Sequence, residues 1–147
     1  EIWAAMPHDK SADAAGVLFN DMPEYDAALV LSESDAARWA ALATAREGVF
    51  WTLAGAVNAK TIGKSLEAAI TMGGEHAKAL AAEQESFLAE IFIVSKVKLD
   101  TAADGIEVIA AQGEKCQRCW TVSEHVGEDS EHEALCPRCA HVVKTEE

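Results

Sequence analysis

The chain has 147 residues, half of them apolar, and its 25 acidic and 12 basic side chains give a formal net charge of −13. This size and composition are typical of a globular protein with one or two small domains. They argue against a protein that holds nucleic acid by bulk electrostatics, because phosphate neutralisation requires clustered lysines and arginines, so any such contact must be local.

The first seven residues predict the end of a helix. Ile2, Trp3 and Met6 are apolar at helical spacing, and Pro7 closes the run. No capping residue precedes them, so we expect the helix to begin before this sequence does. Residues 8–31 contain a glycine, a proline and scattered acids, and they predict an irregular connection with about one short extended piece.

A long helix is predicted from about Asp35 to Lys60. Ser34 and Asp35 can cap its first turn, and residues 61–63 supply a stop signal with a glycine. Apolar side chains recur every three or four residues, which predicts one face buried in a core rather than a ligand pocket. The members of this stripe are Trp39, Leu42, Val49, Phe50, Leu53 and Val57.

Three strands and one helix are expected between the long helix and the cysteines. Residues 66–72 form an alternating run that is bounded by glycines on both sides, and this predicts a strand. Residues 75–90 are rich in Ala, Glu and Leu, which predicts a helix. Residues 91–99 predict the second strand, with lysines on one side, and residues 106–110 predict the third. Asp104-Gly105 between them predicts that these two strands pair as a hairpin.

Four cysteines fall in two pairs with sixteen residues between them: Cys116 and Cys119, then Cys136 and Cys139. Two Cys-x-x-Cys turns at this separation can bring four thiolates round one zinc ion in tetrahedral geometry. Four protein ligands leave no position for water, so the predicted zinc ion is structural and not catalytic. We expect the segment after Gly113 to have little structure of its own and to depend on the metal for order.

Two disulfides and a rubredoxin-like iron site are the alternatives. Disulfides require an oxidising compartment, but the sequence shows neither a signal peptide nor an apolar run of 18 residues, which also predicts no membrane partner. An iron site would use the same ligands, and nothing else in the sequence indicates electron transfer. Histidines could replace a thiolate, although four cysteines make this unnecessary: His125, His132 and His141.

Several short stretches of sequence, the two cysteine turns among them, follow one another along the chain in a characteristic order. They are Glu1-Ile2-Trp3 with Met6-Pro7, Lys60–Ala68, Ile93-Val94-Ser95, Cys116-Gln117-Arg118-Cys119-Trp120 and Leu135-Cys136-Pro137-Arg138-Cys139. In this order they resemble the C-terminal region of bacterial isoleucyl-tRNA synthetases, and the resemblance runs over nearly the whole chain.

This resemblance implies the C-terminal piece of a cytoplasmic class I aminoacyl-tRNA synthetase, whose parent joins isoleucine to its tRNA using ATP. The implied fold is α+β. Residues 1–63 would end a helical anticodon-binding domain, residues 64–112 would form a small mixed α/β unit, and residues 113–147 would form a four-cysteine zinc finger. The ATP-handling signatures, His-x-Gly-His and a Lys-Met-Ser-Lys-Ser type loop, have no counterpart here. The chain alone is therefore expected to carry no catalytic site.

The resemblance also implies that the zinc module lies against the anticodon stem-loop of the tRNA, with the remaining domains of the parent as further partners. Single-stranded loops are bound by stacking bases on aromatic or guanidinium planes. Trp120, Arg118 and Arg138 have this chemistry, and Lys115 adds a charge beside the first cysteine turn. Alternatively, the tryptophan shields the zinc, and the arginines are solvated or support the thiolates. Weaker candidates are Lys60, Lys64, Lys96 and Lys98.

Two other functions stay open. A zinc-ribbon module for protein interaction would suit the charge of −13. The same cysteine spacing also occurs in the zinc finger of formamidopyrimidine-type DNA glycosylases. Those enzymes attack from an N-terminal proline amine beside a glutamate, whereas this sequence begins Glu1-Ile2-Trp3, which argues against them.

Overall fold

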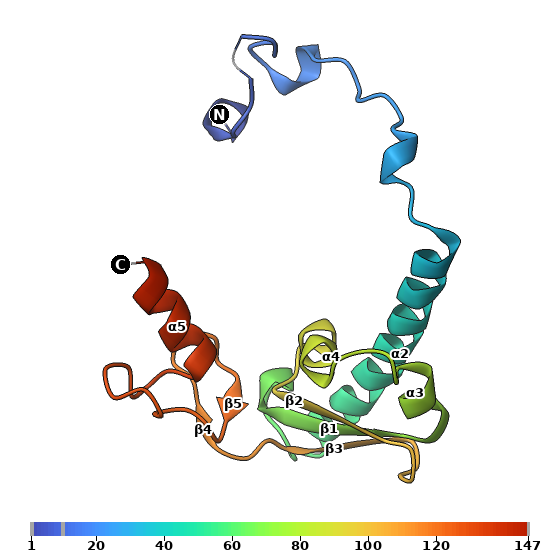
Figure 1. Ribbon diagram of the computed structural model, residues 1–147, viewed down its shortest axis with the longest axis vertical. Helices are drawn as coiled ribbons and strands as arrows, with labels where there is room; N and C mark the ends of the chain where they lie inside the picture. Colours follow the sequence, from blue (N-terminus) through green and yellow to red (C-terminus); the bar gives the residue numbers. More distant parts are fainter. Residues whose placement is uncertain (1, 10, 147) are drawn as a thin grey trace. The chain divides into compact units, whose positions relative to one another are not determined.

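The computed structural model describes residues 2–9 and 11–146, and these form two compact units that divide between Ser32 and Glu33 (Figure 1). The first unit contains α1 (Ile2–Ala5) and two 3-10 turns, η1 (Val17–Phe19) and η2 (Ala27–Leu29). This agrees with the predicted helix end and irregular connection. None of the described residues in this unit is fully buried.

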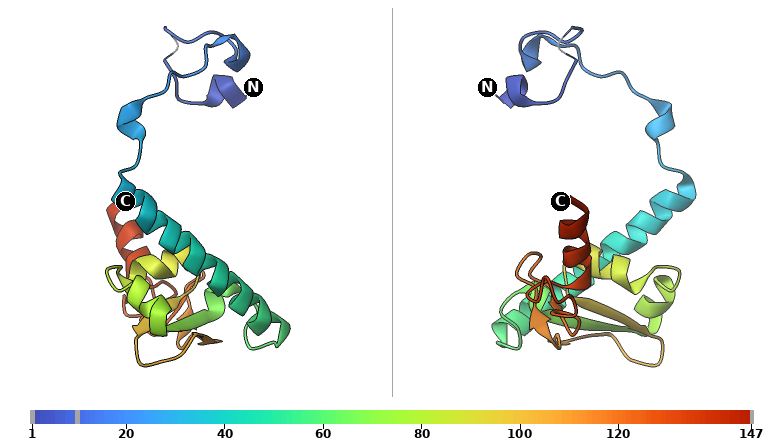
Figure 2. Two further views of the ribbon diagram at one scale, coloured as in Figure 1. Left: turned by 90° about the vertical axis from the view of Figure 1, so that its right-hand side faces the viewer. Right: turned by 60° about the vertical axis from the view of Figure 1, so that its left-hand side comes forward.

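The second unit is built on a three-stranded sheet of β1 (Ala68–Gly73), β2 (Lys96–Asp100) and β3 (Ile106–Ala110). The strand order is β2-β1-β3, with β1 and β2 parallel and β1 and β3 antiparallel. The predicted hairpin of the second and third strands is therefore wrong, because β1 lies between them. Figure 2 shows α2 (Glu33–Asn58) running along one face of this sheet.

A close approach at the end of β1 explains this arrangement. The Gly73 N–H donates to the Gly105 carbonyl oxygen at 2.7 Å. A Cβ atom on Gly73 would lie 2.5 Å from the backbone of Ala103, so only glycine lets the loop between β2 and β3 cross the strand end. The Asp104-Gly105 turn thus carries the chain from one side of β1 to the other.

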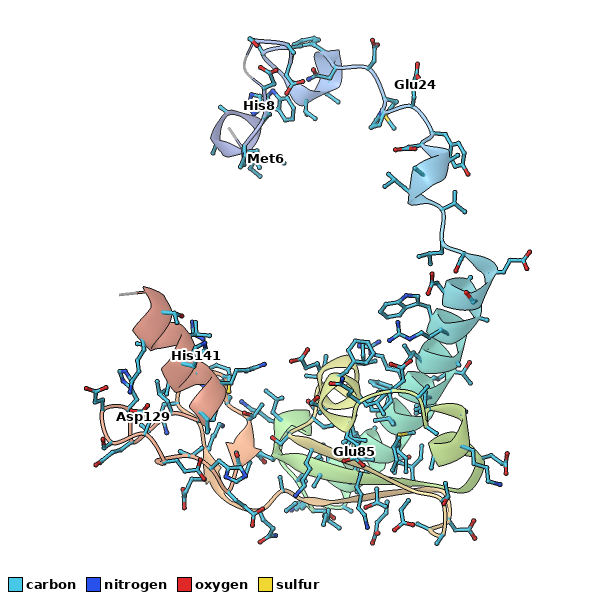
Figure 3. All side chains as sticks on the ribbon, viewed as in Figure 1. Met6, His8, Glu24, Glu85, Asp129 and His141 are labelled. Atoms are coloured by element: carbon cyan, nitrogen blue, oxygen red, sulfur yellow. The ribbon has the colours of Figure 1, made fainter. Side chains whose placement is uncertain are left out.

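The single helix predicted for residues 75–90 is two helices, α3 (Gly74–Ala79) and α4 (Glu85–Phe92). Leu80 lies in the turn between them and is buried, which brings the chain back to the core before α4 begins. Helix α4 ends at Ile93, which adopts a left-handed conformation, so β2 starts later than predicted. Glu85, labelled in Figure 3, accepts the Leu99 N–H at 2.8 Å and covers the edge of β2.

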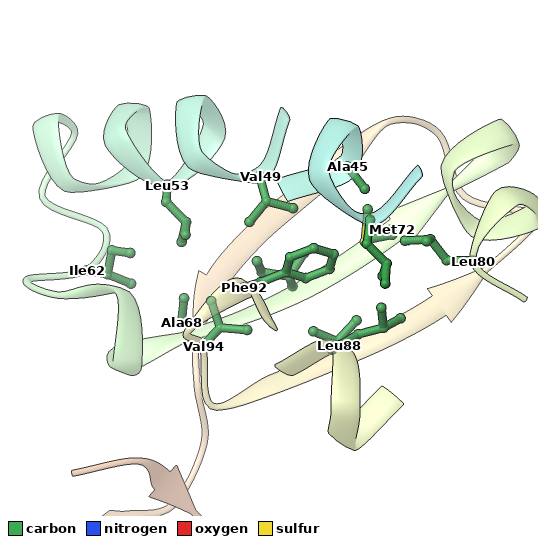
Figure 4. Packing of buried hydrophobic residues seen from close by; sticks show 13 residues of the cluster. Ala45, Val49, Leu53, Ile62, Ala68, Met72, Leu80, Leu88, Phe92 and Val94 are labelled. Atoms are coloured by element: carbon green, nitrogen blue, oxygen red, sulfur yellow. The ribbon is translucent and has the colours of Figure 1, made fainter. Parts of the chain in front are cut away.

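Helix α2 buries a narrower stripe than predicted. Leu42, Ala45, Val49 and Leu53 pack toward the sheet, α4 and β1 (Figure 4). Three members of the predicted stripe lie largely outside this core, because the helix is apolar on nearly all sides and its periodicity does not single out one face. Trp39, Phe50 and Val57 are 43%, 60% and 40% exposed.

The C-terminal segment has more regular structure than predicted. After η3 (Ser65–Glu67) and the sheet come a small ladder of β4 (Glu114–Lys115) and β5 (Val122–Ser123), and then α5 (Pro137–Glu146). The α+β fold class with a C-terminal four-cysteine module is confirmed. Within the ranges that the structure describes, no helix has the length and apolar character needed to cross a membrane.

Candidate metal centre

Four thiols meet where the β4–β5 turn faces the start of α5. The sulfur atoms of Cys116, Cys119, Cys136 and Cys139 all lie within 4.8 Å of one another. The Cys119 and Cys136 sulfurs are 3.8 Å apart, which is about the edge of a tetrahedron with Zn–S bonds of about 2.3 Å. All four thiols are free, so the structure does not support the disulfide alternative.

Backbone hydrogen bonds hold the first cysteine pair. The Cys116 N–H donates to the Thr121 carbonyl oxygen and the Trp120 N–H donates to the Cys116 carbonyl oxygen, both at 2.9 Å. Trp120 takes a left-handed conformation with φ of 67°, which closes the turn. The Cys136 N–H then donates to the Cys116 sulfur at 3.3 Å and joins the second pair to the first.

Electrostatics at the cluster favour a bound cation. Burial raises the pKa of the Cys116 thiol, but the backbone N–H groups of Cys119, Cys136 and Arg118 outweigh it and lower that pKa to about 6. Burial raises the pKa of Cys136 to about 12, and the adjoining Cys139 thiol adds to the rise. The raised pKa of Cys136 means that its thiol loses its proton readily only beside added positive charge, which a divalent metal ion supplies.

Histidines do not join the thiols. Among the described residues, the only group of three or more potential metal ligands is the cysteine cluster. His125 contacts the Glu128 carboxylate at 2.6 Å, which raises the pKa of its imidazole. His141 is exposed on α5 (Figure 3).

The two arginines inside the cysteine turns lie beside the thiols. Arg118 places Nη1 4.0 Å from the Cys139 sulfur. Arg138 contacts the Glu90 carboxylate at 3.2 Å, and the Cys119 thiol raises the pKa of its guanidinium. These contacts favour support of the thiolates, one of the two roles considered from the sequence. A role in RNA contact stays a prediction for both.

Trp120 lies on the surface beside two lysines. Its side chain is 57% exposed, and the ammonium groups of Lys115 and Lys64 lie 5.8 and 6.0 Å from its ring centroid. The Lys64 backbone is held by Glu67, whose carboxylate accepts the N–H groups of Gly63 and Lys64. Lys64 ranked among the weaker candidates, and its approach to the ring depends on a tertiary contact that no local pattern reveals.

Two of the other lysine candidates have acidic neighbours. Lys96 lies 4.0 Å from the Glu124 carboxylate, and Lys98 lies 3.1 Å from Asp100. Lys96 and Arg138 line a groove of about 800 Å³ between the sheet and the zinc module. Because both cations already have acidic neighbours, the groove is less suited to phosphate than the surface around Trp120.

Comparison with known proteins supports both the predicted zinc site and the resemblance to isoleucyl-tRNA synthetases. Residues 113–142 match a family described as "Zinc finger found in FPG and IleRS". With the thiol cluster, this match bears out the predicted cofactor, one structural zinc ion. The isoleucine–tRNA ligases of Bacillus cereus and Bacillus anthracis are 39% and 40% identical over 98% of this chain.

These relatives are much longer proteins, and the chain spans 17% of their length. The zinc-finger family alone includes two kinds of protein, but the similarity to the ligases extends far beyond the cysteines. The resemblance seen in the sequence is thus confirmed, and the chain is similar over nearly its whole length to part of the bacterial isoleucine–tRNA ligases.

Proposed function

We propose that the chain is the C-terminal, tRNA-binding part of an isoleucine–tRNA ligase. The similarity over 98% of the chain to proteins of that name supports this most directly. The whole polypeptide would attach isoleucine to its tRNA using ATP in the cytoplasm. The part described here would contact the anticodon stem-loop, while the reaction takes place on other domains.

In this proposal the four cysteines hold one zinc ion and no water completes its coordination. Cys116 and Cys119 bind it from the β4–β5 turn, and Cys136 and Cys139 bind it from the start of α5. The N-terminal end of α5 favours negative charge and therefore supports the second pair as thiolates. The bound zinc contributes folding free energy and fixes the backbone that carries Trp120.

The exposed Trp120 ring supports an RNA contact at this place. An unpaired base can stack on an aromatic plane, and neighbouring cations can neutralise the backbone phosphates of the same RNA strand. Lys64 and Lys115 lie near that ring, and neither forms an ion pair with another described residue. This local pair of charges fits a chain whose overall charge of −13 repels RNA elsewhere.

Gel shifts with Trp120→Ala test the proposal. We expect the wild-type chain to bind isoleucine tRNA more tightly than a non-cognate tRNA. Loss of one stacking plane costs about 1–3 kcal/mol, so the variant should bind about 5- to 150-fold more weakly. Trp51→Ala is the matched control, because Trp51 is 67% exposed and lies on α2, away from the metal centre.

Equal binding by the wild type and Trp120→Ala would contradict the stacking role. Failure of the wild-type chain to bind tRNA, together with full aminoacylation by a parent enzyme that lacks these residues, would contradict the tRNA-binding function itself. Capture of protein domains in place of tRNA would instead favour the zinc-ribbon interaction module.

A further inference from the structure

Cys119 is the most exposed thiol of the metal centre. Cys116 and Cys139 are 0% and 1% exposed. Cys136 is 7% exposed, whereas Cys119 is only partly buried. Cys119 and Cys136 also line the groove of about 800 Å³ between the sheet and the zinc module. A small molecule that enters this groove can therefore reach these two sulfurs, and Cys119 is the more open of them.

The surroundings of Cys119 control how fast its sulfur can react. Cysteines bind zinc as thiolates, and the thiolate is the form that peroxides oxidise. The Thr121 hydroxyl lies 3.0 Å from the Cys119 sulfur, and the Arg138 guanidinium also contacts that sulfur. Because both groups stabilise negative charge on the sulfur, they lower its nucleophilicity and slow its oxidation.

Cys136 supplies the second sulfur that a disulfide needs. Its sulfur lies 3.8 Å from that of Cys119, so a small movement of one side chain brings the pair to the S–S bond length of about 2.05 Å. The two residues belong to different Cys-x-x-Cys turns. A bond between them would therefore join the β4–β5 turn to the start of α5.

We propose that Cys119 is a modification site for hydrogen peroxide and that its stable product is a disulfide to Cys136. The Cys119 thiolate attacks one peroxide oxygen, the O–O bond breaks and hydroxide leaves, which gives a sulfenic acid. The Cys136 thiolate then attacks this sulfur, the S–O bond breaks and a second hydroxide leaves. Two thiolates thus give two electrons to one molecule of peroxide.

The disulfide should release the metal ion. Cys116 and Cys139 would be the only thiolates left, and two thiolates hold zinc much more weakly than four. Trp120 follows Cys119 directly, so the turn that carries its ring should lose order as well. A thiol reductant together with added zinc should restore the centre, because a disulfide is reversible.

Peptide mapping of the zinc-loaded protein after treatment with hydrogen peroxide tests the proposal. Zinc release would be followed with a chromogenic zinc indicator, and the remaining thiols would be alkylated before digestion with trypsin. Trypsin cuts after Arg118 and Arg138, and it has no other site within residues 119–138. We expect this peptide to appear first with an internal disulfide, two hydrogen atoms lighter than its reduced form, at the rate of zinc release.

Thr121→Val provides a kinetic test. Without the hydroxyl, the Cys119 thiolate loses a hydrogen-bond donor and becomes more nucleophilic. Zinc release should then be about threefold faster, after subtraction of the release without peroxide. Thr145→Val is the matched control, because its hydroxyl donates to backbone carbonyl oxygens of its own helix, α5, and the rate should stay the same.

Three results would overturn the proposal. In the first, residues 119–138 are joined in the first product to residues 116–118 or 139–144, which would show a different pairing. In the second, zinc release is not reversed by a thiol reductant and added zinc, which would indicate a sulfinic acid. In the third, Thr121→Val reacts no faster than the wild type. The mapping uses the wild-type chain and no tRNA, so it is separate from the gel shifts and does not depend on either variant.

Discussion

Ser95 joins the zinc module to the sheet through one hydroxyl group. Its Oγ donates to the Leu66 carbonyl oxygen at 2.5 Å and accepts the Val122 N–H at 2.7 Å. Its backbone N–H also donates to the Ala68 carbonyl oxygen at 3.0 Å. A single side chain therefore connects the entrance of β1 with β5, beside the metal centre.

Ser95→Ala should loosen this connection. The substitution leaves a partly buried N–H and a partly buried carbonyl without their shared partner, so we expect the free energy of unfolding to fall by about 1–3 kcal/mol. Denaturant unfolding measures this fall, and faster hydrogen exchange at the Val122 amide locates it. Thr145→Ala removes an exposed hydroxyl of α5 and should change the unfolding free energy by less than about 0.5 kcal/mol. Equal effects of the two substitutions would refute the link.

The residues of the metal centre could be predicted because the chemistry is encoded locally. Two Cys-x-x-Cys turns at the spacing of Cys119 and Cys136 already restrict the ligand geometry. The position of Lys64 beside Trp120 could not be predicted, because the two residues are 56 positions apart in the sequence and come together only after the sheet has formed. The Ser95 link has the same origin in tertiary structure.

At the scale of elements, local patterns predicted which segments are strands better than which strands pair. The third strand was predicted with its observed bounds, since it is rich in β-branched residues and a glycine precedes it. The hairpin was wrong because β1 and β2 form a parallel pair across α3 and α4, and such long-range pairing leaves no signal at the Asp104-Gly105 turn.

Metal removal should affect the elements unequally. Chelation of the zinc ion, or Cys116→Ser, is expected to abolish hydrogen-exchange protection in β4, β5 and α5. The buried core of this part is a small cysteine cluster and not a large apolar one, so its order depends on the metal. The amides of α2 should keep their protection, since Leu42 and Val49 pack in the separate core of the sheet. Restored protection after zinc is added back is the control. Unchanged exchange in α5 after chelation would disprove a structural metal.

At the scale of the whole molecule, the distribution of charge decides how RNA can be held. The 25 acids outnumber the 12 bases, so a tRNA meets a repulsive field except where cations lack acidic neighbours. Arg138 and Lys98 each contact a carboxylate, whereas Lys64 and Lys115 lie against the exposed Trp120 ring. Binding should therefore depend on few phosphate contacts and still weaken clearly with salt.

The salt dependence of tRNA binding measures how many phosphates are neutralised. Each contact to a single strand contributes about −0.7 to the slope of log K against log salt concentration. The double variant Lys64→Gln/Lys115→Gln should therefore make the slope shallower by about 1.4 in filter-binding titrations. Lys78→Gln/Lys98→Gln removes the same total charge from residues that pair with Glu75 and Asp100, and it should leave the slope unchanged. If both double variants reduce the slope equally, net charge and not the Trp120 surface governs binding.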